Sequence, residues 1–447
     1  MYPLTTIKTK TMKRQLKYLC ILCYFIFFTK PTVAQSNEKN EITFIKAGKL
    51  FDSENGKILT NYVIKIENNK ITEVGKNSSI PENVKIIDLT EYTVLPGLID
   101  GHTHLMSLDD FKDKHPMAEK VLFEGDALRV LRGSNRARTW LEAGFTTVRD
   151  LGDSGPFLDV ALKKAINEGT TIGPRMFVSG PIIISEGGQV PGLIKSQRHV
   201  IEDEYTIVKN VDDAINAVRI HVNYGADIIK ICANNSPNNT SLTIDEMKAI
   251  VKMAHRYNKK VTAHATNDLA VWEAVTAGVD GIEHGYQISD TTLTLMAKKG
   301  VALVPTDLTR PILKKVLNMM DYKEDTDVAI KGYKDRYQDR LQRAIKAGVT
   351  ILTGSDNYID LKMPQGEAAK NVLIAYEEEG MKPLDIIRSS TYLSAKFMGK
   401  EDELGTIKEG AFADIIAVKG DILNDFSRTM FNVVFVMKNG EIYLEKE

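Results

Sequence analysis

Cysteine is scarce in this chain, which limits how the fold can be held together. Only Cys20, Cys23 and Cys232 occur among the 447 residues. The first two fall in an N-terminal segment that we expect to be removed. Cys232 then remains alone, which excludes an internal disulfide in the mature chain. A chain with so large a core does not need one.

An excess of charge of either sign is also missing. The formal net charge is −1, so the sequence gives no electrostatic reason to expect binding to nucleic acid or to an anionic membrane. Low-complexity tracts, heptads and fixed-period repeats are absent as well. The composition, with 43% hydrophobic residues, predicts one large domain with a smaller one. It leaves open whether the chain forms a homo-oligomer.

The N-terminus has an apolar run, Tyr18–Phe28, that is too short to span a membrane comfortably. The basic stretch Lys10–Lys17 precedes it and the small residues Thr32–Ala34 follow it, which is the order of a secretory signal peptide. We therefore predict a signal peptide at 1–34, a secreted or periplasmic mature chain and no stable membrane span in it. The alternative is an anchor that is never cleaved, and Met12 is a second candidate start.

Both ends of the mature chain have the texture of short β-strands. Asn68-Asn69 and Asn439-Gly440 are hairpin-turn sequences between β-branched runs. We expect residues 42–96 and 401–447 to pair into one small β-sandwich. The predicted strands are Ile42–Ala47, Val63–Glu67, Lys70–Val74, Val84–Asp88, Ala413–Val418, Val433–Lys438 and Glu441–Leu444.

The middle of the chain alternates between short apolar runs and amphipathic helical patterns such as Val211–Tyr224. Eight such units predict an α/β fold, a parallel (β/α)8 TIM-like barrel over residues 97–400. A doubly wound open sheet is the structural alternative. The predicted strands are Leu98–His102, Thr146–Arg149, Arg175–Ser179, Ile228–Ile231, Val261–His264, Gly281–His284, Ala302–Val304 and Ile351–Thr353.

Polar side chains of the metal-binding kind stand where these strands end, which is where a barrel carries its chemistry. His102 and His104 are two apart on a strand and therefore face the same way, as half of a metal site. His264 and His284 end the fifth and sixth predicted strands. Asp356 follows the eighth, in the place of a ligand and general base. Each histidine alone could be a structural core residue, but their recurrence at strand ends favours a metal site.

Lys230 stands near the end of an apolar strand, where a charged amine is costly unless it is paired. One interpretation is a surface lysine whose stem alone is buried. The functional interpretation is a desolvated, neutral amine that captures carbon dioxide as a carbamate, which could bridge two cations. Cys232, two residues on, we interpret as a packing residue.

The remaining histidines lie away from predicted strand ends. His221 and His255 fall in helical patterns, and His115 and His199 fall in polar loop sequence. We interpret all four as structural or solvated.

Together these features resemble the amidohydrolase superfamily over nearly the whole mature chain. The branch that looks most similar is the imidazolonepropionase-related one, which includes Xaa-Pro dipeptidases with a carboxylated lysine. The matching segments are Leu95–Leu105, Gly144–Gly152, Gly173–Arg175, Gly225–Lys230, Ile282–Gly285, Thr353–Asp356 and Gly405–Asp414.

The resemblance implies a binuclear centre, usually zinc, with a hydroxide and a carboxylated Lys230 bridging two ions. It assigns His102, His104 and Asp356 to the first ion, and His264 and His284 to the second. Two cations would activate water and polarise a carbonyl, while Asp356 would pass the proton to the leaving nitrogen.

Two substrate-facing positions depart from the dipeptidase pattern. Thr266 stands where those proteins tend to carry a tyrosine, and Gln189 stands where they tend to carry a histidine. We therefore assign both residues to substrate binding but place a prolidase-like substrate in doubt. The segment Pro181–Asn210 is interpreted either as a lid or as a surface excursion.

These observations predict an exported, metal-dependent hydrolase that cleaves a carbon–nitrogen bond of a small molecule, such as an amide, dipeptide or cyclic amide. Lactone or ester hydrolysis at the same site is the first alternative. A barrel that has kept its fold without catalysis is the second, and the presence of all six ligand-type residues disfavours it.

Overall fold

The computed structural model describes residues 41–76, 78–110, 121, 123–190, 194–236 and 238–446. The predicted signal peptide and His115 lie outside these ranges. The compact unit described below is Ile42–Glu447. Within the described residues, no helix combines the length and apolarity that crossing a membrane requires.

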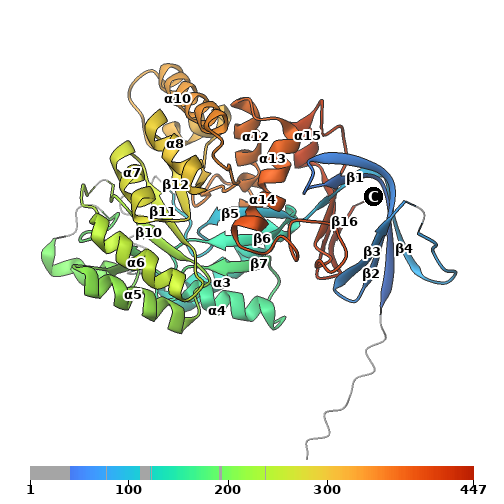
Figure 1. Ribbon diagram of the computed structural model, residues 1–447, viewed down its shortest axis with the longest axis horizontal. Coiled ribbons are helices and arrows are strands. Elements are labelled where there is room, and N and C mark those ends of the chain that lie inside the picture. The colour runs from blue at the N-terminus through green and yellow to red at the C-terminus, as the bar shows by residue number, and fades with distance from the viewer. Residues whose placement is uncertain are drawn as a thin grey trace, which may run out of the picture. The chain divides into compact units, whose positions relative to one another are not determined.

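Strands from both ends of the chain form one seven-stranded sheet, in the order β16-β15-β14-β4-β1-β2-β3 (Figure 1). The strand β4 joins the two ends, because it runs parallel to β1 and antiparallel to β14. Asn439 and Gly440 have φ of 53° and 80°, as a tight hairpin turn requires. The hydrogen bonds define a single sheet, so the predicted division into a two-layer sandwich stays a prediction. The strands are β1 (Ile42–Asp52), β2 (Lys57–Glu67), β3 (Lys70–Gly75), β4 (Lys85–Pro96), β14 (Ile415–Val418), β15 (Val433–Lys438) and β16 (Glu441–Glu445).

The middle of the chain forms parallel strands in two further sheets. Their orders are β5-β6-β7 and β13-β12-β11-β10-β8-β9. Most of these strands are buried on both faces, which explains why they are apolar runs with no alternation. The bounds are β5 (Leu98–Thr103), β6 (Phe145–Asp150), β7 (Arg175–Val178), β8 (Ile182–Ile184), β9 (Tyr205–Ile207), β10 (Ile229–Cys232), β11 (Val261–Ala265), β12 (Gly281–His284) and β13 (Ala302–Val304).

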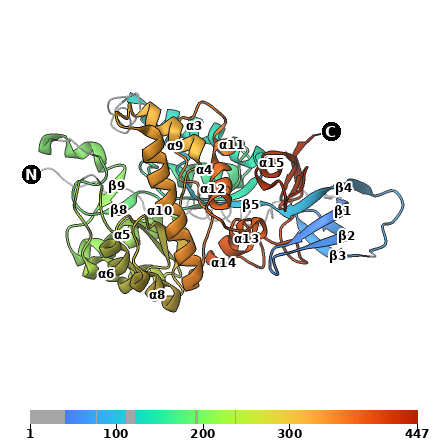
Figure 2. The same cartoon turned by 90° about the horizontal axis from the view of Figure 1, so that it is seen from above.

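Helices follow the strands along the chain, and Figures 1 and 2 show the long α10 beside α8, with which it is in contact. The α6 helix begins with a capping box between Thr243 and Glu246. The helices are α3 (Gly125–Glu142), α4 (Leu158–Asn167), α5 (Val211–Tyr224), α6 (Ile244–Arg256), α7 (Asp268–Ala277), α8 (Asp290–Lys299), α9 (Arg310–Met319), α10 (Thr326–Ala347), α11 (Gln365–Ala369), α12 (Asn371–Glu378), α13 (Pro383–Ser389), α14 (Tyr392–Phe397), α15 (Phe426–Phe431) and the 3-10 helix η1 (Lys195–Ile201).

Backbone hydrogen bonds that are not part of the regular strand pairing connect the edges of the two parallel sheets. Asp227 N donates to Val178 O at 2.7 Å, and Gly101 N donates to Thr353 O at 2.8 Å. The predicted eighth strand, Ile351–Thr353, is reduced to one parallel bridge between Ile351 and Leu303. The expectation of eight regular strands is therefore not met, and a closed barrel stays a prediction.

Parts of the segment Pro181–Asn210 belong to the sheet that contains β10 to β13, and its interpretation as a lid or as a surface excursion stays a prediction. The segment contributes β8 and β9, which pair with each other in parallel. A buried ion pair between Arg129 of α3 and Glu204 fixes it to the body of the domain.

Asp100 connects β5 to the segment that carries Asp356. Its buried carboxylate accepts hydrogen bonds from Ser355 N at 2.8 Å, from Ser355 Oγ at 2.6 Å and from Trp140 Nε1 at 2.9 Å. Burial raises the pKa of Asp100, and these donors counteract that shift.

Replacing Trp140 by phenylalanine removes one donor to this buried carboxylate. We expect Trp140→Phe to lower the free energy of unfolding by about 1–3 kcal/mol, measured by urea denaturation. The control is Trp272→Phe, because this tryptophan is 42% exposed and its loss should change stability by less than about 0.5 kcal/mol. Equal changes in both variants would contradict the role of Trp140.

Candidate metal centre

The predicted first-ion residues converge at one end of β5. His102 Nε2 lies 3.2 Å from His104 Nε2. Asp356 Oδ1 lies 3.1 Å from His104 Nε2 and 3.5 Å from His102 Nε2. Asp356 is 18% exposed and has φ of 49°, so a strained residue presents a partly accessible carboxylate to two buried imidazoles.

Lys230 of β10 joins this group. Its Nζ lies 3.2 Å from His102 Nε2, and the side chain is only 2% exposed. A surface lysine with a buried stem is therefore excluded. Burial lowers the pKa of Lys230, against the opposing charges of Glu283 and Asp356, and so favours the neutral amine.

The hydrogen bonds made by the Nδ1 atoms of His102 and His104 leave the opposite ring nitrogens available to a cation. His102 Nδ1 donates to the Glu283 carboxylate at 2.8 Å, and His104 Nδ1 donates to Gly152 O at 2.9 Å, since both oxygens can only accept. His102 Nε2 then carries a lone pair that faces the His104 ring and Lys230. This lone pair is available to a cation, and the neutral form of His104 would offer a second one 3.2 Å away.

The pKa shifts of the histidines support the same interpretation with one exception. Burial lowers the pKa of His102 and His284 well below the usual value, and that of His264 to about 3. Burial acts on His104 too, but the carboxylates of Asp153 and Asp356 outweigh it and raise its pKa to about 9. The neutral imidazole is the form that binds a metal.

The two residues predicted for the second ion, His264 and His284, differ in how close they lie to His102 and Asp356. The ligand atoms of His284, His102 and Asp356 lie within 4.8 Å of one another, so His284 is placed among the predicted first-ion residues. Thr306 Oγ1 lies 2.8 Å from His284 Nδ1. His264 contacts the His284 ring edge-on, with centroids 4.6 Å apart, but does not belong to that three-residue group. The division of ligands between two ions therefore stays a prediction.

The two predicted substrate positions lie beside β11. Gln189 Nε2 lies 3.5 Å from His264 Nε2, so this side chain faces a predicted ligand. Thr266 Oγ1 accepts from Asn234 Nδ2 at 2.8 Å, and Thr266 N donates to Asn234 Oδ1 at 3.0 Å. The threonine is thus held by the neighbouring loop.

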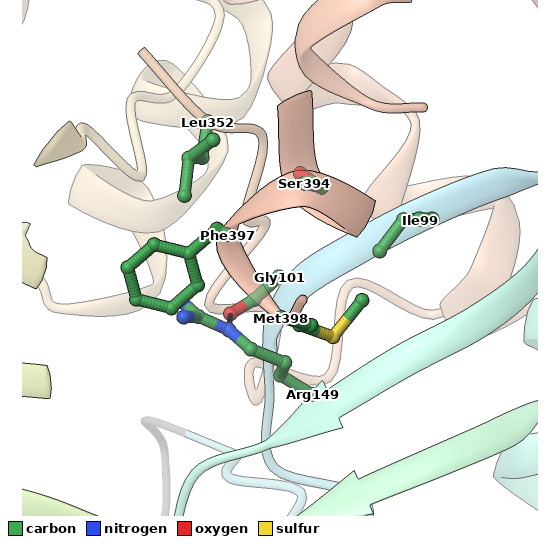
Figure 3. A pocket seen from close by; sticks show the side chains of 7 residues that line it. All are labelled: Ile99, Gly101, Arg149, Leu352, Ser394, Phe397 and Met398. Atoms are coloured by element: carbon green, nitrogen blue, oxygen red, sulfur yellow. Dashed lines mark hydrogen bonds between the residues drawn. The ribbon is translucent and has the colours of Figure 1, made fainter. Parts of the chain in front are cut away.

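Glu283 and Arg149 are site residues to which the sequence analysis gave no role. Glu283 is fully buried and accepts from Arg149 Nη2 at 2.8 Å, as well as from His102. Arg149 donates through Nε to Gly101 O at 2.6 Å and lies 4.8 Å from the centroid of Phe397 (Figure 3). The signal was present, because a charged residue inside an apolar strand needs a partner.

Three further residues flank the histidines. Asp153 Oδ2 lies 3.6 Å from His104 Nδ1. The ring of Tyr286 lies 5.5 Å from that of His284, and the ring of Tyr358 lies 5.9 Å from that of His104. No pattern in the sequence distinguished these residues from ordinary loop residues.

Three of the four histidines that we interpreted as structural or solvated lie in the described residues, and none of the three contacts the cluster. His221 is buried, with its ring nitrogens 2.7 Å from Ala217 O and 2.7 Å from Pro181 O. His255 is exposed and contacts Asp280 at 2.9 Å. His199 is exposed but lies in η1 rather than in a loop, a correction of the predicted local structure.

Cys232 is buried among apolar side chains that include Ile182 and Tyr205. Burial raises the pKa of its thiol to about 12, which keeps it protonated and unreactive. This environment agrees with the predicted packing role.

The amidohydrolase family model matches residues 93–443, so the chain belongs to the amidohydrolase family. Ochratoxinase from Aspergillus niger is 29% identical over 445 residues, covering 93% of this chain and 89% of that protein. Imidazolonepropionase from Fusobacterium nucleatum is 24% identical over 390 residues, covering 80% and 85%. The predicted family resemblance is confirmed, and it places the chain among hydrolases of carbon–nitrogen bonds.

Solved structures agree with this placement. A Xaa-Pro dipeptidase with bound methionine is 30% identical, with a TM-score of 0.78 over 90% of this chain and 100% of that one. A prolidase complexed with N-methylphosphonate-L-proline is 27% identical, with a TM-score of 0.79 over 91% and 100%. These are members of a TIM-barrel family, so the α/β class of the fold is confirmed.

Glu283 orients His102, and its replacement tests the centre directly. In Glu283→Gln the amide oxygen can still accept from Arg149, but its NH2 then faces His102 Nδ1 and moves the ring proton to Nε2. We expect zinc affinity to fall about 10–100-fold, measured by competition with a chelating dye.

The control is Thr262→Val, which removes a hydroxyl donor to the same carboxylate and leaves the His102 contact in place. It should bind zinc about as well as the wild type. If Glu283→Gln also bound zinc with unchanged affinity, the orienting role would be wrong.

Proposed function

We propose that this protein hydrolyses a carbon–nitrogen bond of a small molecule with the help of two divalent cations, zinc being the expected metal. The observation that carries the proposal is the convergence of His102 Nε2, His104 Nε2, Lys230 Nζ and Asp356 Oδ1 in one cluster, in which Asp356 is the partly exposed member. Nitrogen and carboxylate donors of this kind suit zinc.

The proposed ligand set is the one that the family resemblance implies. His102, His104 and Asp356 would hold one cation, His264 and His284 the other, and Lys230 would contribute to both as a carbamate. Bound cations would acidify a water molecule and polarise the scissile carbonyl. The lowered pKa of Lys230 supports the carbamate, because only the neutral amine reacts with carbon dioxide.

Asp356 is the proposed proton carrier. Its Oδ1 contacts both imidazoles of the histidine pair, while its Oδ2 lies 3.8 Å from His284 Nδ1. A carboxylate that is partly exposed at the edge of the cluster can accept a proton from the attacking water at one oxygen. The same carboxylate can then deliver it to the leaving nitrogen.

The substrate is proposed to be an amide, a dipeptide or a cyclic amide. The names of the relatives, an ochratoxinase and prolidases, support a small molecule, and both groups align over most of the chain. Thr266 Oγ1 accepts from Asn234 Nδ2 and keeps its O–H as a donor, but it lacks the length and the ring of a tyrosine. This supports a substrate other than that of the Xaa-Pro dipeptidases.

Assays on the purified mature chain test the proposal. We expect turnover of at least one compound in a panel of N-acyl amino acids, dipeptides and cyclic amides. A chelator should abolish it and zinc should restore it. Lactones and esters are assayed in parallel, and their hydrolysis with a silent amide panel would contradict carbon–nitrogen cleavage. Turnover that survives complete metal removal would contradict the role of the cations.

Lys230→Ala separates the lysine from the rest of the site. It should abolish turnover, and short-chain acids with bicarbonate should partly restore it by supplying the missing carboxylate. Lys298→Ala, at an exposed lysine of α8, is the matched control and should leave turnover unchanged. Full activity of Lys230→Ala with no additive would rule out the bridging role.

We also propose that the chain is exported, on the strength of the N-terminal sequence pattern. Expressed at full length in a bacterial host, the protein should be recovered outside the cytoplasm with its N-terminus near Gln35, as identified by mass spectrometry. A membrane-bound product that keeps Met1 or Met12 would favour the uncleaved anchor.

A further inference from the structure

We propose that Arg340 is a positioning residue for the metal centre, because it fixes the main-chain turn that carries His284. The geometry of the turn stands by itself, while its consequence for metal binding rests on the proposed function. Arg340 lies on α10, 56 residues beyond His284 in the chain.

The turn needs support because its backbone is in a region that side chains disfavour. His284 has φ of 70°, and Gly285 follows with φ of 57°. A left-handed conformation is ordinary for glycine but is disfavoured for a residue with a side chain. Contacts from elsewhere in the fold must therefore hold His284 in place.

Arg340 supplies the contact to the main chain. Its Nη1 donates to His284 O at 2.5 Å, and its Nη2 pairs with the carboxylate of Asp307. The guanidinium is 1% exposed and Asp307 is fully buried. A planar guanidinium that is already held by a carboxylate presents its remaining N–H in a fixed direction.

The imidazole is held from the same segment. Thr306 Oγ1 lies 2.8 Å from His284 Nδ1, and Thr306 directly precedes Asp307. The pair Thr306–Asp307 therefore controls the ring directly and the carbonyl through Arg340. These two contacts together fix the imidazole and the carbonyl of His284.

A second ion pair stabilises the same region of α10. Lys334 Nζ lies 2.6 Å from Glu379 Oε1 and donates to Leu308 O at 3.2 Å. Lys334 and Glu379 are buried as well. The buried ion pair of Arg340 with Asp307 is costly to assemble and gives no more stability than apolar packing would. The contact of this pair with His284 O favours a geometric role.

The experiment compares three variants of the full mature chain. Arg340→Met removes the hydrogen bond to His284 O, and Arg340→Lys keeps the charge without the planar fork. Arg343→Met is the matched control, since Arg343 also lies on α10 and donates to a carbonyl, that of Ile288, at 2.8 Å. We expect Arg340→Met to lower zinc affinity about 10–100-fold, Arg340→Lys to recover part of it, and Arg343→Met to bind as the wild type does.

Loss of Arg340 also leaves Asp307 as a buried, unpaired charge, which can destabilise the whole domain. The double variant Arg340→Met with Asp307→Asn removes both charges and should regain thermal stability without regaining the bond to His284 O. We expect its zinc affinity to stay low and, in a crystal structure of its metal-free form, φ of His284 to leave the positive region. Recovery of zinc affinity together with stability would show that Arg340 only stabilises the fold and would overturn the inference.

These outcomes are distinct from failure of the proposed function. If the wild type bound no zinc, the proposed function would be wrong, and the conformation of His284 in the metal-free double variant would still test Arg340. A wild-type φ at His284 in that variant would overturn the positioning role independently of any metal.

Discussion

The buried carboxylate of Glu283 is the constraint on which the centre of the molecule depends. A fully buried charge has to be satisfied by nearby donors, and this one takes them from three other strands. His102 comes from β5, Arg149 from β6 and Thr262 from β11. One side chain on β12 thus fixes the relative positions of four strands and the tautomer of a predicted ligand, so the fold and the site are specified by the same interactions.

The other predicted ligands are also held from behind, but by different means. A main-chain carbonyl, Gly152 O, holds His104, and a hydroxyl with a buried guanidinium holds His284. Because each ring is fixed on its outer side, the inner nitrogens have little freedom to turn away from one another. Polar ligand atoms this close together keep their positions in a folded chain only with such support. The surrounding apolar core provides the stability that offsets the cost of burying them.

The sequence predicted the position of a side chain correctly where that position depends on the strand to which it belongs. A His-x-His pair on an apolar strand, and charged residues at strand ends, predicted His102, His104, Lys230 and Asp356 as neighbours, and they are within contact distance. The sequence did not predict contacts or strand pairing that depend on packing between distant segments. Arg340 reaches His284 O from a helix that reads as an ordinary amphipathic surface element. Likewise, Ile351–Thr353 has a strand composition but pairs through a single bridge.

The same distribution of charge explains why Lys230 can be neutral. Its possible counter-ion, Glu283, already satisfies Arg149 and His102, so the lysine is buried beside a carboxylate whose charge is largely compensated. Burial therefore outweighs the attraction and lowers the pKa of the amine. The positive charge of Arg149 lowers the pKa of Lys230 further, in the same direction as burial. Arg149, which touches no predicted ligand, thus helps to keep the amine neutral, which is the form that the proposed carbamate requires.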